Sequence, residues 1–480
     1  PLVLSIQAPA SFDSLSAPLD RTAVTVYNTS GSGVHESTLL VRDGTDWALG
    51  RPVAHTVPYY LGFVVVDVAS RGKLHLRPIT ANRPGQTISV RGMLTGVESL
   101  TLADGTSATL AASGGTWVSS SPGGASADDA SWTSWACEAE LSACGSSMPP
   151  FLTGSSAGRY AFGSLRLVGD ARVTVDGGVR ALGGAGMELL GGSRVTVKGP
   201  QVEQQLRIQA RDRFRLAPGA AILADGGGYP GNTRHSSCFD GGARNGGLHG
   251  GGPAGQSCGD YEWPVLAGAG GSPGQYAGGS GGGSVMLVCN ASESSAMELN
   301  GTVSVDGLDG RAYSSGSGSA SGGGAGGSLL VVASRLSGSG TLSADGGAGA
   351  NGYSSYDSNG GSGGRIALHA YQPSRTNFTG TVRARAGAAY GSWSVQAAAG
   401  TVYWCDGRVG ESEAALEGEA NSHRCGVRRL ELDNGDLPKT SYYPQLSISG
   451  GRRRFVIDEL HLETATHVSI QAPPDFDADT

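Results

Sequence analysis

Four Asp-Gly pairs come closest to a chemical motif in this sequence. Asp176, Asp225, Asp306 and Asp345 each precede a glycine at the end of a short apolar segment. Recurring carboxylates can bind Ca²⁺, but Asp-Gly is also a common turn pair. Tandem nonapeptides of the GGxGxDxUx type, which bind calcium in other repeat proteins, are absent. The pattern favours a turn role, with Ca²⁺ as the alternative, and we expect no other cofactor.

No catalytic set can be assembled from the remaining polar residues. Polygalacturonase-like sites need N-T-D, D-D and G-H-G signatures, and the nearest segments are Asn232-Thr233-Arg234, a lone Asp128-Asp129 and Leu248-His249-Gly250. Glycosidases need two carboxyl groups about 5–9.5 Å apart, which only a fold can supply. The nine histidines do not form an evident Ser/His/Asp or Cys/His set. We therefore predict no catalytic residue and a protein that is not an enzyme.

The cysteines fall into pairs along the chain. Six of the seven are spaced by seven residues in one pair and by twenty in two others, and Cys289 is left over. Zinc sites require CxxC or Cys/His spacings, which are absent. Disulfides are the better interpretation, and they imply an oxidising compartment. The predicted pairs are Cys137 with Cys144, Cys238 with Cys258, and Cys405 with Cys425.

Four N-x-S/T sequons agree with an extracellular location. They begin at Asn28, Asn290, Asn300 and Asn377. N-glycosylation occurs at such sequons in the surface loops of secreted proteins. The last three are predicted to lie in turns between the first and second strands of their repeats, where attached glycans would share one flank.

Composition excludes two classes of partner. The net charge of −7 argues against nucleic acid, which requires a basic surface. No apolar run approaches the ~20 residues that a membrane-spanning helix needs. Charged residues make up only 16% of the chain, which contains 81 glycines among 480 residues. Such a composition indicates many short strands and turns.

A repeat in the C-terminal half predicts the fold. Glycine-rich tracts end at Gly283, Gly327, Gly364 and Gly400, spaced by 44, 37 and 36 residues, and each is followed by a short apolar strand. A second strand recurs between them, in "GTVSVDG", "GTLSADG" and "GTVRARAG". Units too small for their own core must bury their apolar faces against neighbours. We therefore predict an all-β parallel β-helix with long glycine-rich loops; the alternative is an array of β-sandwich domains.

The glycine tracts themselves suggest close backbone packing. From residue 226 to 283, 22 of 58 residues are glycine, but aromatic residues such as Trp263 interrupt the tract, which is not typical of a flexible linker. Without Cβ atoms, extended three-residue helices can pack side by side. The "GGxGG" motif before apolar strands, with "GTLSADGG", resembles the glycine-rich domains of anaplastic lymphoma kinase-type receptors. It is also similar to glycine-rich β-helical extracellular proteins of algae and protists. These resemblances imply ordered polyglycine helices packed beside strands.

A longer repeat links the two ends of the sequence. Ser5, Ile6, Gln7, Ala8 and Pro9 recur 464 residues later as Ser469, Ile470, Gln471, Ala472 and Pro473. Phe12-Asp13 recurs at the same offset as Phe476-Asp477. This pattern predicts a super-repeat of 464 residues. In such a repeat, the strand at the end of one unit has the same sequence as the strand at its beginning.

These patterns divide the chain into four predicted parts. They are a strand-rich segment over 1–115, a Ser/Gly-rich disulfide loop over 116–158, a glycine-rich β-helix over 159–410, and the start of the next super-repeat over 411–480. We expect a structural glycoprotein module that stacks end to end with other copies of itself, with the shaft of a flagellar hair (mastigoneme) as one candidate. A polysaccharide-binding adhesin or a carbohydrate-active enzyme is the alternative.

Overall fold

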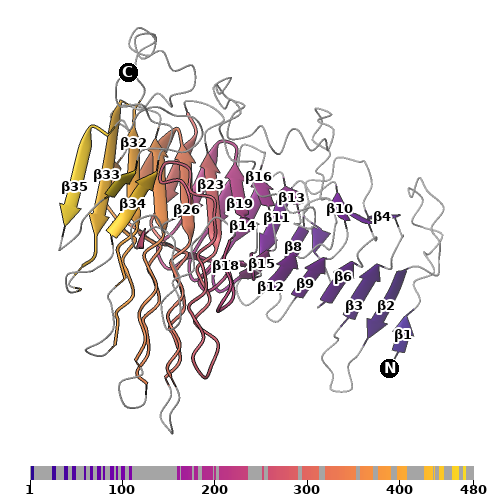
Figure 1. Cartoon of the computed structure of the whole chain (residues 1–480). Coiled ribbons are helices and arrows are strands. Elements are labelled where there is room, and N and C mark those ends of the chain that lie inside the picture. The colour runs from indigo at the N-terminus through magenta and orange to yellow at the C-terminus, as the bar shows by residue number, and fades with distance from the viewer. Residues whose placement is uncertain are drawn as a thin grey trace. The chain divides into compact units, whose positions relative to one another are not determined.

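The computed structural model shows an all-β chain with no helix among the residues it describes (Figure 1). Side chains are described in 165–175, 178–179, 181, 186–197, 199–201, 205–235, 258–289, 294–312, 319–352, 357–370, 377–390, 397–407, 426–435, 437 and 457–463, and elsewhere only strand backbones. The chain divides into two compact units. Unit 1 comprises 1–132, 154–198 and 206–222, and unit 2 comprises 133–153, 199–205 and 223–480.

Unit 1 consists of short strands in sheets whose pairings are mostly parallel. In each sheet the strands pair in the following orders. One order is β1 (Leu2–Leu4), β2 (Val24–Asn28), β3 (Ser37–Val41), β6 (Val65–Val68), β9 (Thr87–Val90), β12 (Ser107–Leu110), β15 (Arg172–Val175) and β18 (Arg194–Val197). A second is β5 (Tyr59–Tyr60), β8 (Ile79–Ala81), β11 (Ser99–Leu102), β14 (Ser164–Leu167), β17 (Met187–Leu189) and β20 (Arg213–Leu216). The others are β13 (Arg159–Phe162), β16 (Gly178–Ala181) and β19 (Leu206–Ala210), and β4 (Asp46–Leu49), β7 (Lys73–Leu76) and β10 (Met93–Thr95).

Unit 2 repeats the same construction with longer connections. After β21 (Ala221–Leu223), where the boundary between the units falls, strands again enter three sheets in turn. The first contains β23 (Ser284–Cys289), β26 (Ser328–Ala333), β29 (Arg365–Ala370), β32 (Thr401–Asp406), β33 (Val427–Asp433) and β35 (Glu459–Glu463). The second contains β24 (Ala296–Leu299), β27 (Arg335–Gly338) and β30 (Asn377–Phe378), and the third β25 (Thr302–Ser304), β28 (Thr341–Ser343) and β31 (Thr381–Arg383). A small further sheet contains β22 (Gly251–Gly252), β34 (Tyr443–Ser447) and β36 (Ser469–Gln471).

Most described pairings are parallel and in register. β23, β26, β29 and β32 align residue for residue over six positions. The described antiparallel pairs are β1 with β2, β2 with β3, β22 with β34, and β32 with β33. An immunoglobulin-type sandwich has antiparallel sheets, so the predicted sandwich array does not describe these strands.

Each repeat has one strand more than the sequence analysis assigned. The predicted turn between the two recurring strands contains a further short strand, namely β24, β27 or β30. We define a triplet as three consecutive strands that enter the three sheets in turn, such as β23–β25. The additional strands were missed because they are two to four residues long and lie beside polar residues, so their period-two pattern is weak.

The β23–β32 sheet is buried on both faces. All six residues of β23, β26 and β29 are buried. On one face, Met286, Val288, Leu330 and Val332 belong to a core cluster that also includes Tyr261 and Trp263. Parallel strands buried on both faces read as continuous apolar runs in sequence, and "SVMLVC" and "SLLVVA" have this character.

Candidate functional site

The glycine tracts leave the third strand of one triplet and return to the first strand of the next. We call 305–312, 344–352 and 384–390 the outgoing segments, and 319–327, 357–364 and 397–400 the returning segments. In Figure 1 they run side by side as extended traces away from the strands. Backbone hydrogen bonds join them directly, without regular β-ladders.

Hydrogen bonds from the returning segment 322–327 have a period of three residues. The N–H groups of Gly322 and Ala325 donate to the segment 269–272, to Ser272 and Ala269. Those of Gly323 and Gly326 donate to the next returning segment, at Asn359 and Ser362, and those of Gly324 and Gly327 donate to the outgoing segment, at Leu308 and Val305. The donor–acceptor distances are 2.8–3.1 Å. Three successive residues therefore point to three different neighbours, as in a helix with three residues per turn.

Glycine is required at the contact points because the backbones touch. A Cβ on Gly324 would lie 2.1 Å from the carbonyl oxygen of Ser280, and one on Gly361 would lie 1.9 Å from that of Gly324. A Cβ on Gly327 would lie 1.9 Å from the carbonyl oxygen of Gly283. These obstructions are main-chain atoms, so a side-chain rotation cannot relieve them. The tracts are thus a packed array, in which the missing side chain is a structural requirement.

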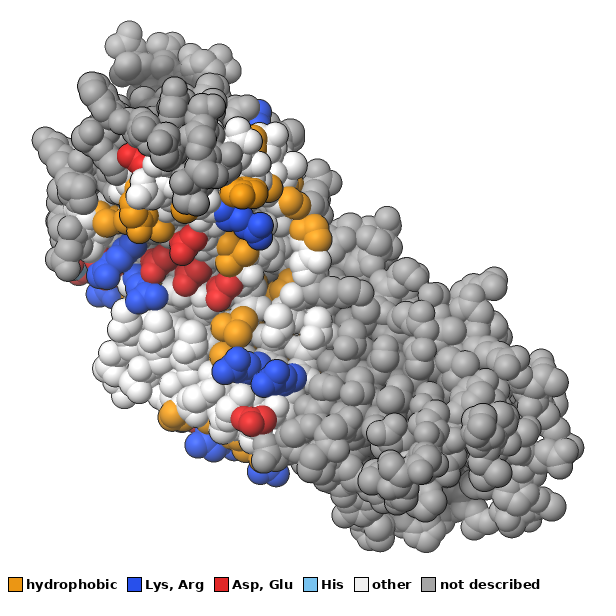
Figure 2. All heavy atoms as spheres, turned by 90° about the horizontal axis from the view of Figure 1, so that it is seen from below, with side chains coloured by type: hydrophobic (Ala, Val, Ile, Leu, Met, Phe, Trp, Pro, Cys, Tyr) orange, Lys and Arg blue, Asp and Glu red, His pale blue; other side chains and the backbone are white. Residues whose placement is uncertain are grey.

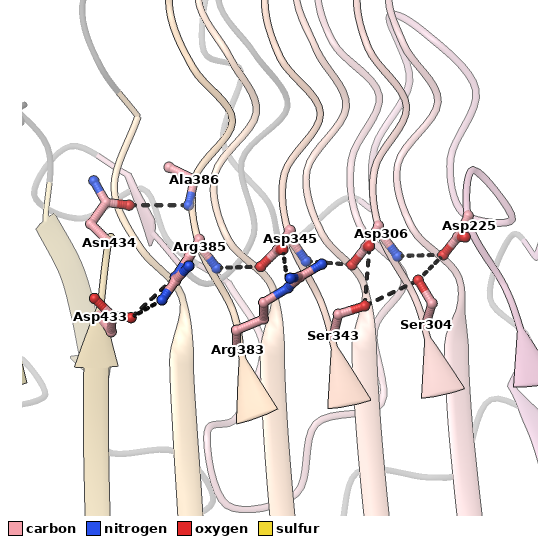
Figure 3. Close-up of polar contacts among 10 residues, drawn as sticks. All are labelled: Asp225, Ser304, Asp306, Ser343, Asp345, Arg383, Arg385, Ala386, Asp433 and Asn434. Carbon is pink, nitrogen blue, oxygen red and sulfur yellow. Dashed lines mark hydrogen bonds and ion pairs between the residues drawn. The ribbon is translucent and has the colours of Figure 1, made fainter. Parts of the chain in front are cut away.

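A row of polar side chains lies where the strands meet this array (Figure 3). We call Asp225, Asp306, Asp345, Arg385, Asp433 and Asn434 the polar ladder. The carboxylate of Asp225 accepts the N–H of Asp306 at 2.9 Å, that of Asp306 accepts the N–H of Asp345 at 2.7 Å, and that of Asp345 accepts the N–H of Arg385 at 2.8 Å. Each carboxylate therefore attaches its own triplet to the next one.

Serines and arginines complete the ladder. Ser304 donates to Asp225, and Ser343 donates to Asp306 at 3.1 Å. Arg383 pairs with Asp345 at 2.6 Å, and Arg385 pairs with Asp433 at 2.6 Å. Asn434, the residue that follows the antiparallel strand β33, accepts the N–H of Ala386 at 3.1 Å. Figure 2 shows acidic and basic side chains next to one another on the described surface, beside an area of backbone and uncharged polar groups.

The acidic part of the ladder carries perturbed carboxyl groups. Burial, followed by the negative charges of Asp345 and Asp225, raises the pKa of Asp306 to about 6. Burial also raises the pKa of Asp345, while the N–H of Arg385 and the guanidinium groups of Arg383 and Arg385 oppose that shift. Among the residues that the structure describes, no group of three or more His, Cys, Asp and Glu side chains is placed to hold a metal ion. The aspartates of the ladder accept backbone N–H groups, and the calcium alternative stays untested.

A second cluster of ionisable residues is buried in the core of unit 2. His369 Nε2 lies 2.8 Å from the backbone oxygen of Glu262, which can only accept, so this nitrogen carries the proton. The imidazole stacks on Trp263, with ring centroids 4.3 Å apart. Arg365 donates to the Cys258 carbonyl at 2.9 Å, and burial lowers the pKa of its guanidinium to about 10. Arg365 is 1% exposed and His369 0%, and their bonds to the backbone oxygens of Cys258 and Glu262 attach the segment 258–263 to strand β29.

The sequence-predicted residues are only partly brought together. Asp225, Asp306 and Asp345 lie in one ladder, whereas Asp176 is outside the described residues. Arg383, Arg385, Asp433 and Asn434 were not singled out from the sequence. Aligning "GTVRARAG" with "GTVSVDG" and "GTLSADG" places Arg385 at the position of Asp306 and Asp345, and that alignment is the signal that could have identified it.

The predicted cysteines and sequons have mixed outcomes. Cys258 and Cys405 are each disulfide-bonded, and Cys289 is a buried thiol that donates to the backbone oxygen of Ala296 at 3.4 Å. Asn300 lies between β24 and β25, where its amide nitrogen donates to Glu298 at 2.7 Å. Asn377 begins strand β30, so its predicted place in a turn was wrong. Asn28 ends β2, and the described residues do not include Asn290, Cys137, Cys144, Cys238 or Cys425.

Only part of the predicted super-repeat is described. Ser469, Ile470 and Gln471 form β36, which pairs in parallel with β34. Ser5–Pro9 and Ala472–Pro473 lie outside the described residues, so the equivalence of the two copies stays a prediction.

Comparisons with protein-family models, with curated proteins and with solved structures found no match, so function is inferred from the chain's own geometry. None of the described segments is a helix long and apolar enough to cross a membrane.

Proposed function

We propose that this chain is a structural module of an extracellular glycoprotein filament or cell-surface appendage. In this proposal the triplets form a parallel β-solenoid, and the glycine tracts form an array of polyglycine-type helices along one side. Successive modules stack end to end, within a tandem chain or between copies. A flagellar hair shaft is one assembly of this kind.

The three-way hydrogen bonding of residues 322–327 is the observation that supports this proposal most strongly. Six consecutive N–H groups are bonded to three neighbouring segments, and the glycine contacts leave no space for a side chain. Such an array uses many residues to hold backbone against backbone. A rigid rod needs this property, whereas an enzyme or an adhesin needs a surface shaped to its ligand.

The surface of the described residues gives less support to polysaccharide binding. Two aromatic side chains, Tyr276 and Tyr390, are among the large exposed hydrophobic residues, and they belong to different glycine segments. An adhesin that stacks sugars would instead present a row of aromatic rings along one face.

Electron microscopy of negatively stained native protein tests the proposal. We expect rods or filaments with a regular axial repeat, and a mass loss on enzymatic removal of N-linked glycans. Discrete monomeric particles at all concentrations would contradict the assembly, and an unchanged mass would contradict the glycoprotein assignment. Retention of monomers on an insoluble polysaccharide would favour the adhesin instead.

A further inference from the structure

The apolar core of unit 2 continues to the edge of its sheet and becomes exposed there. Tyr403 of β32 lies opposite Leu430 of β33, and Leu430 lies opposite Leu460 of β35. Leu430 and Leu432 are 0% and 1% exposed, whereas their partners Leu460 and Leu462 are each 46% exposed. The same face is therefore fully buried on one strand and open on the next.

Strand β35 is the last strand of this sheet among those described. It pairs in parallel with β33, and all five of its residues are exposed. A strand at a sheet edge offers backbone N–H and C=O groups to a further strand. Proteins shield such edges with charged side chains, especially lysine, with proline or with bulges. In "ELHLE" neither lysine nor proline occurs, and the charged residues Glu459 and Glu463 stand at the two ends of the strand.

The sequence of β35 resembles that of an interior strand elsewhere in the chain. Strand β7 has the sequence "KLHL" followed by Arg77, which repeats the Leu-His-Leu centre of "ELHLE" with basic instead of acidic flanks. β7 pairs in parallel on both sides, with β4 and with β10. The Leu-His-Leu sequence therefore occurs, in β7, in a strand that has a neighbour on each side.

We propose that the outer edge of β35 is the surface on which a second copy of this chain adds a β-strand that covers Leu460 and Leu462. The inference rests on the proposed function and identifies one end of the stacking interface. Among the described strands, β1 (Leu2–Leu4) is apolar, ends its sheet and pairs on one side, with β2, so its other edge can pair with a further strand. A second copy therefore contains an apolar strand with an open edge, and the repeat of Ser5–Pro9 at Ser469–Pro473 favours contact between like modules.

Sedimentation velocity of the full chain over a range of concentrations tests this surface. The double variant Leu460→Glu/Leu462→Glu should raise the dissociation constant of self-association at least tenfold, since it places two charges where apolar burial is required. Leu308→Glu is the matched control because Leu308 is 47% exposed but lies on an outgoing glycine segment. The control should associate like the wild type.

Hydrogen exchange on the wild type makes the test independent of whether the variant folds. Residues 459–463 should gain amide protection as the protein concentration rises. Association without this protection, or association unchanged in the folded double variant, would overturn the β35 surface and leave the filament proposal standing. A wild-type chain that stays monomeric at every concentration would overturn both.

Discussion

The carboxylate of Asp306 accepts the backbone N–H of Asp345 at 2.7 Å, 39 residues further along the chain. The same bond recurs from Asp225 to Asp306 and from Asp345 to Arg385. Each triplet thus supplies an acceptor for an N–H of the next triplet, at the point where strands change into glycine segments. Removing one acceptor should loosen the junction between two triplets.

The buried charge of Asp306 should make stability depend on pH. Because the pKa of Asp306 is raised to about 6, the folded chain binds this proton more tightly than the unfolded chain. The contribution to stability therefore falls as pH rises from about 4 through 6, and burial of Asp345 acts in the same direction. In Asp306→Asn the melting temperature should change less between pH 5 and pH 7.5 than in the wild type.

Two further variants separate charge from hydrogen bonding at this position. Asp306→Ala removes the acceptor for the partly buried N–H of Asp345 and should cost about 1 kcal/mol, the lower end of the penalty for an unsatisfied buried group. Asp309→Asn is the matched control, since its exposed carboxylate also accepts one backbone N–H, from Ala348 at 2.7 Å. If Asp306→Asn keeps the full pH dependence of the wild type, the buried carboxylate is not its source.

Substituting glycine within the array should be severely destabilising. In Gly324→Ala the new methyl group would meet the Ser280 carbonyl oxygen, so the backbones must separate. We expect a loss at or above the ~1–3 kcal/mol of ordinary overpacking, measured by thermal unfolding. The control is Gly192→Ala, where the nearest atom is a carboxylate oxygen of the Asp170 side chain. Equal effects of the two substitutions would show that the array is not close-packed.

Arg365 should contribute to stability mainly through its volume and its bond to Cys258. Arg365→Ala empties a fully buried position and should cost about 2–5 kcal/mol. Arg365→Met keeps most of the volume without burying a cation, so its loss should be smaller. Chemical denaturation gives the order of the two variants, and hydrogen exchange should show loosening of residues 258–266 in Arg365→Ala. A methionine variant less stable than the alanine variant would contradict this account.

Non-reducing peptide maps should show Cys238 linked to Cys258 and Cys405 linked to Cys425. Cys258 and Cys405 are both disulfide-bonded, and their predicted partners close loops of about twenty residues. Cleaving one such bond should cost roughly 3 kcal/mol. Cys289 should react with alkylating reagents only after unfolding, because it is buried. A peptide joining Cys258 to Cys405 would refute the predicted pairs.

Parts of this structure could be predicted because they depend on local rules. Strands such as "SVMLVC" and "SLLVVA" are apolar runs preceded by glycine tracts, which indicate strands buried on both faces. The short strands β24, β27 and β30 could not be predicted, because two to four residues carry little periodic signal and depend on their neighbours for stability.

The sequence by itself determined where the glycines lie, where apolar strands recur, and which positions carry Asp or Arg at the end of a repeat. Only the tertiary structure decided that Gly322, Gly323 and Gly324 donate to three different segments, and that Asp306 and Arg385 belong to one ladder. The physical reason is that these bonds join residues about 15–80 positions apart, and their partners depend on the register between triplets. The register is set by the packing of whole strands against one another, so a short stretch of sequence does not specify it.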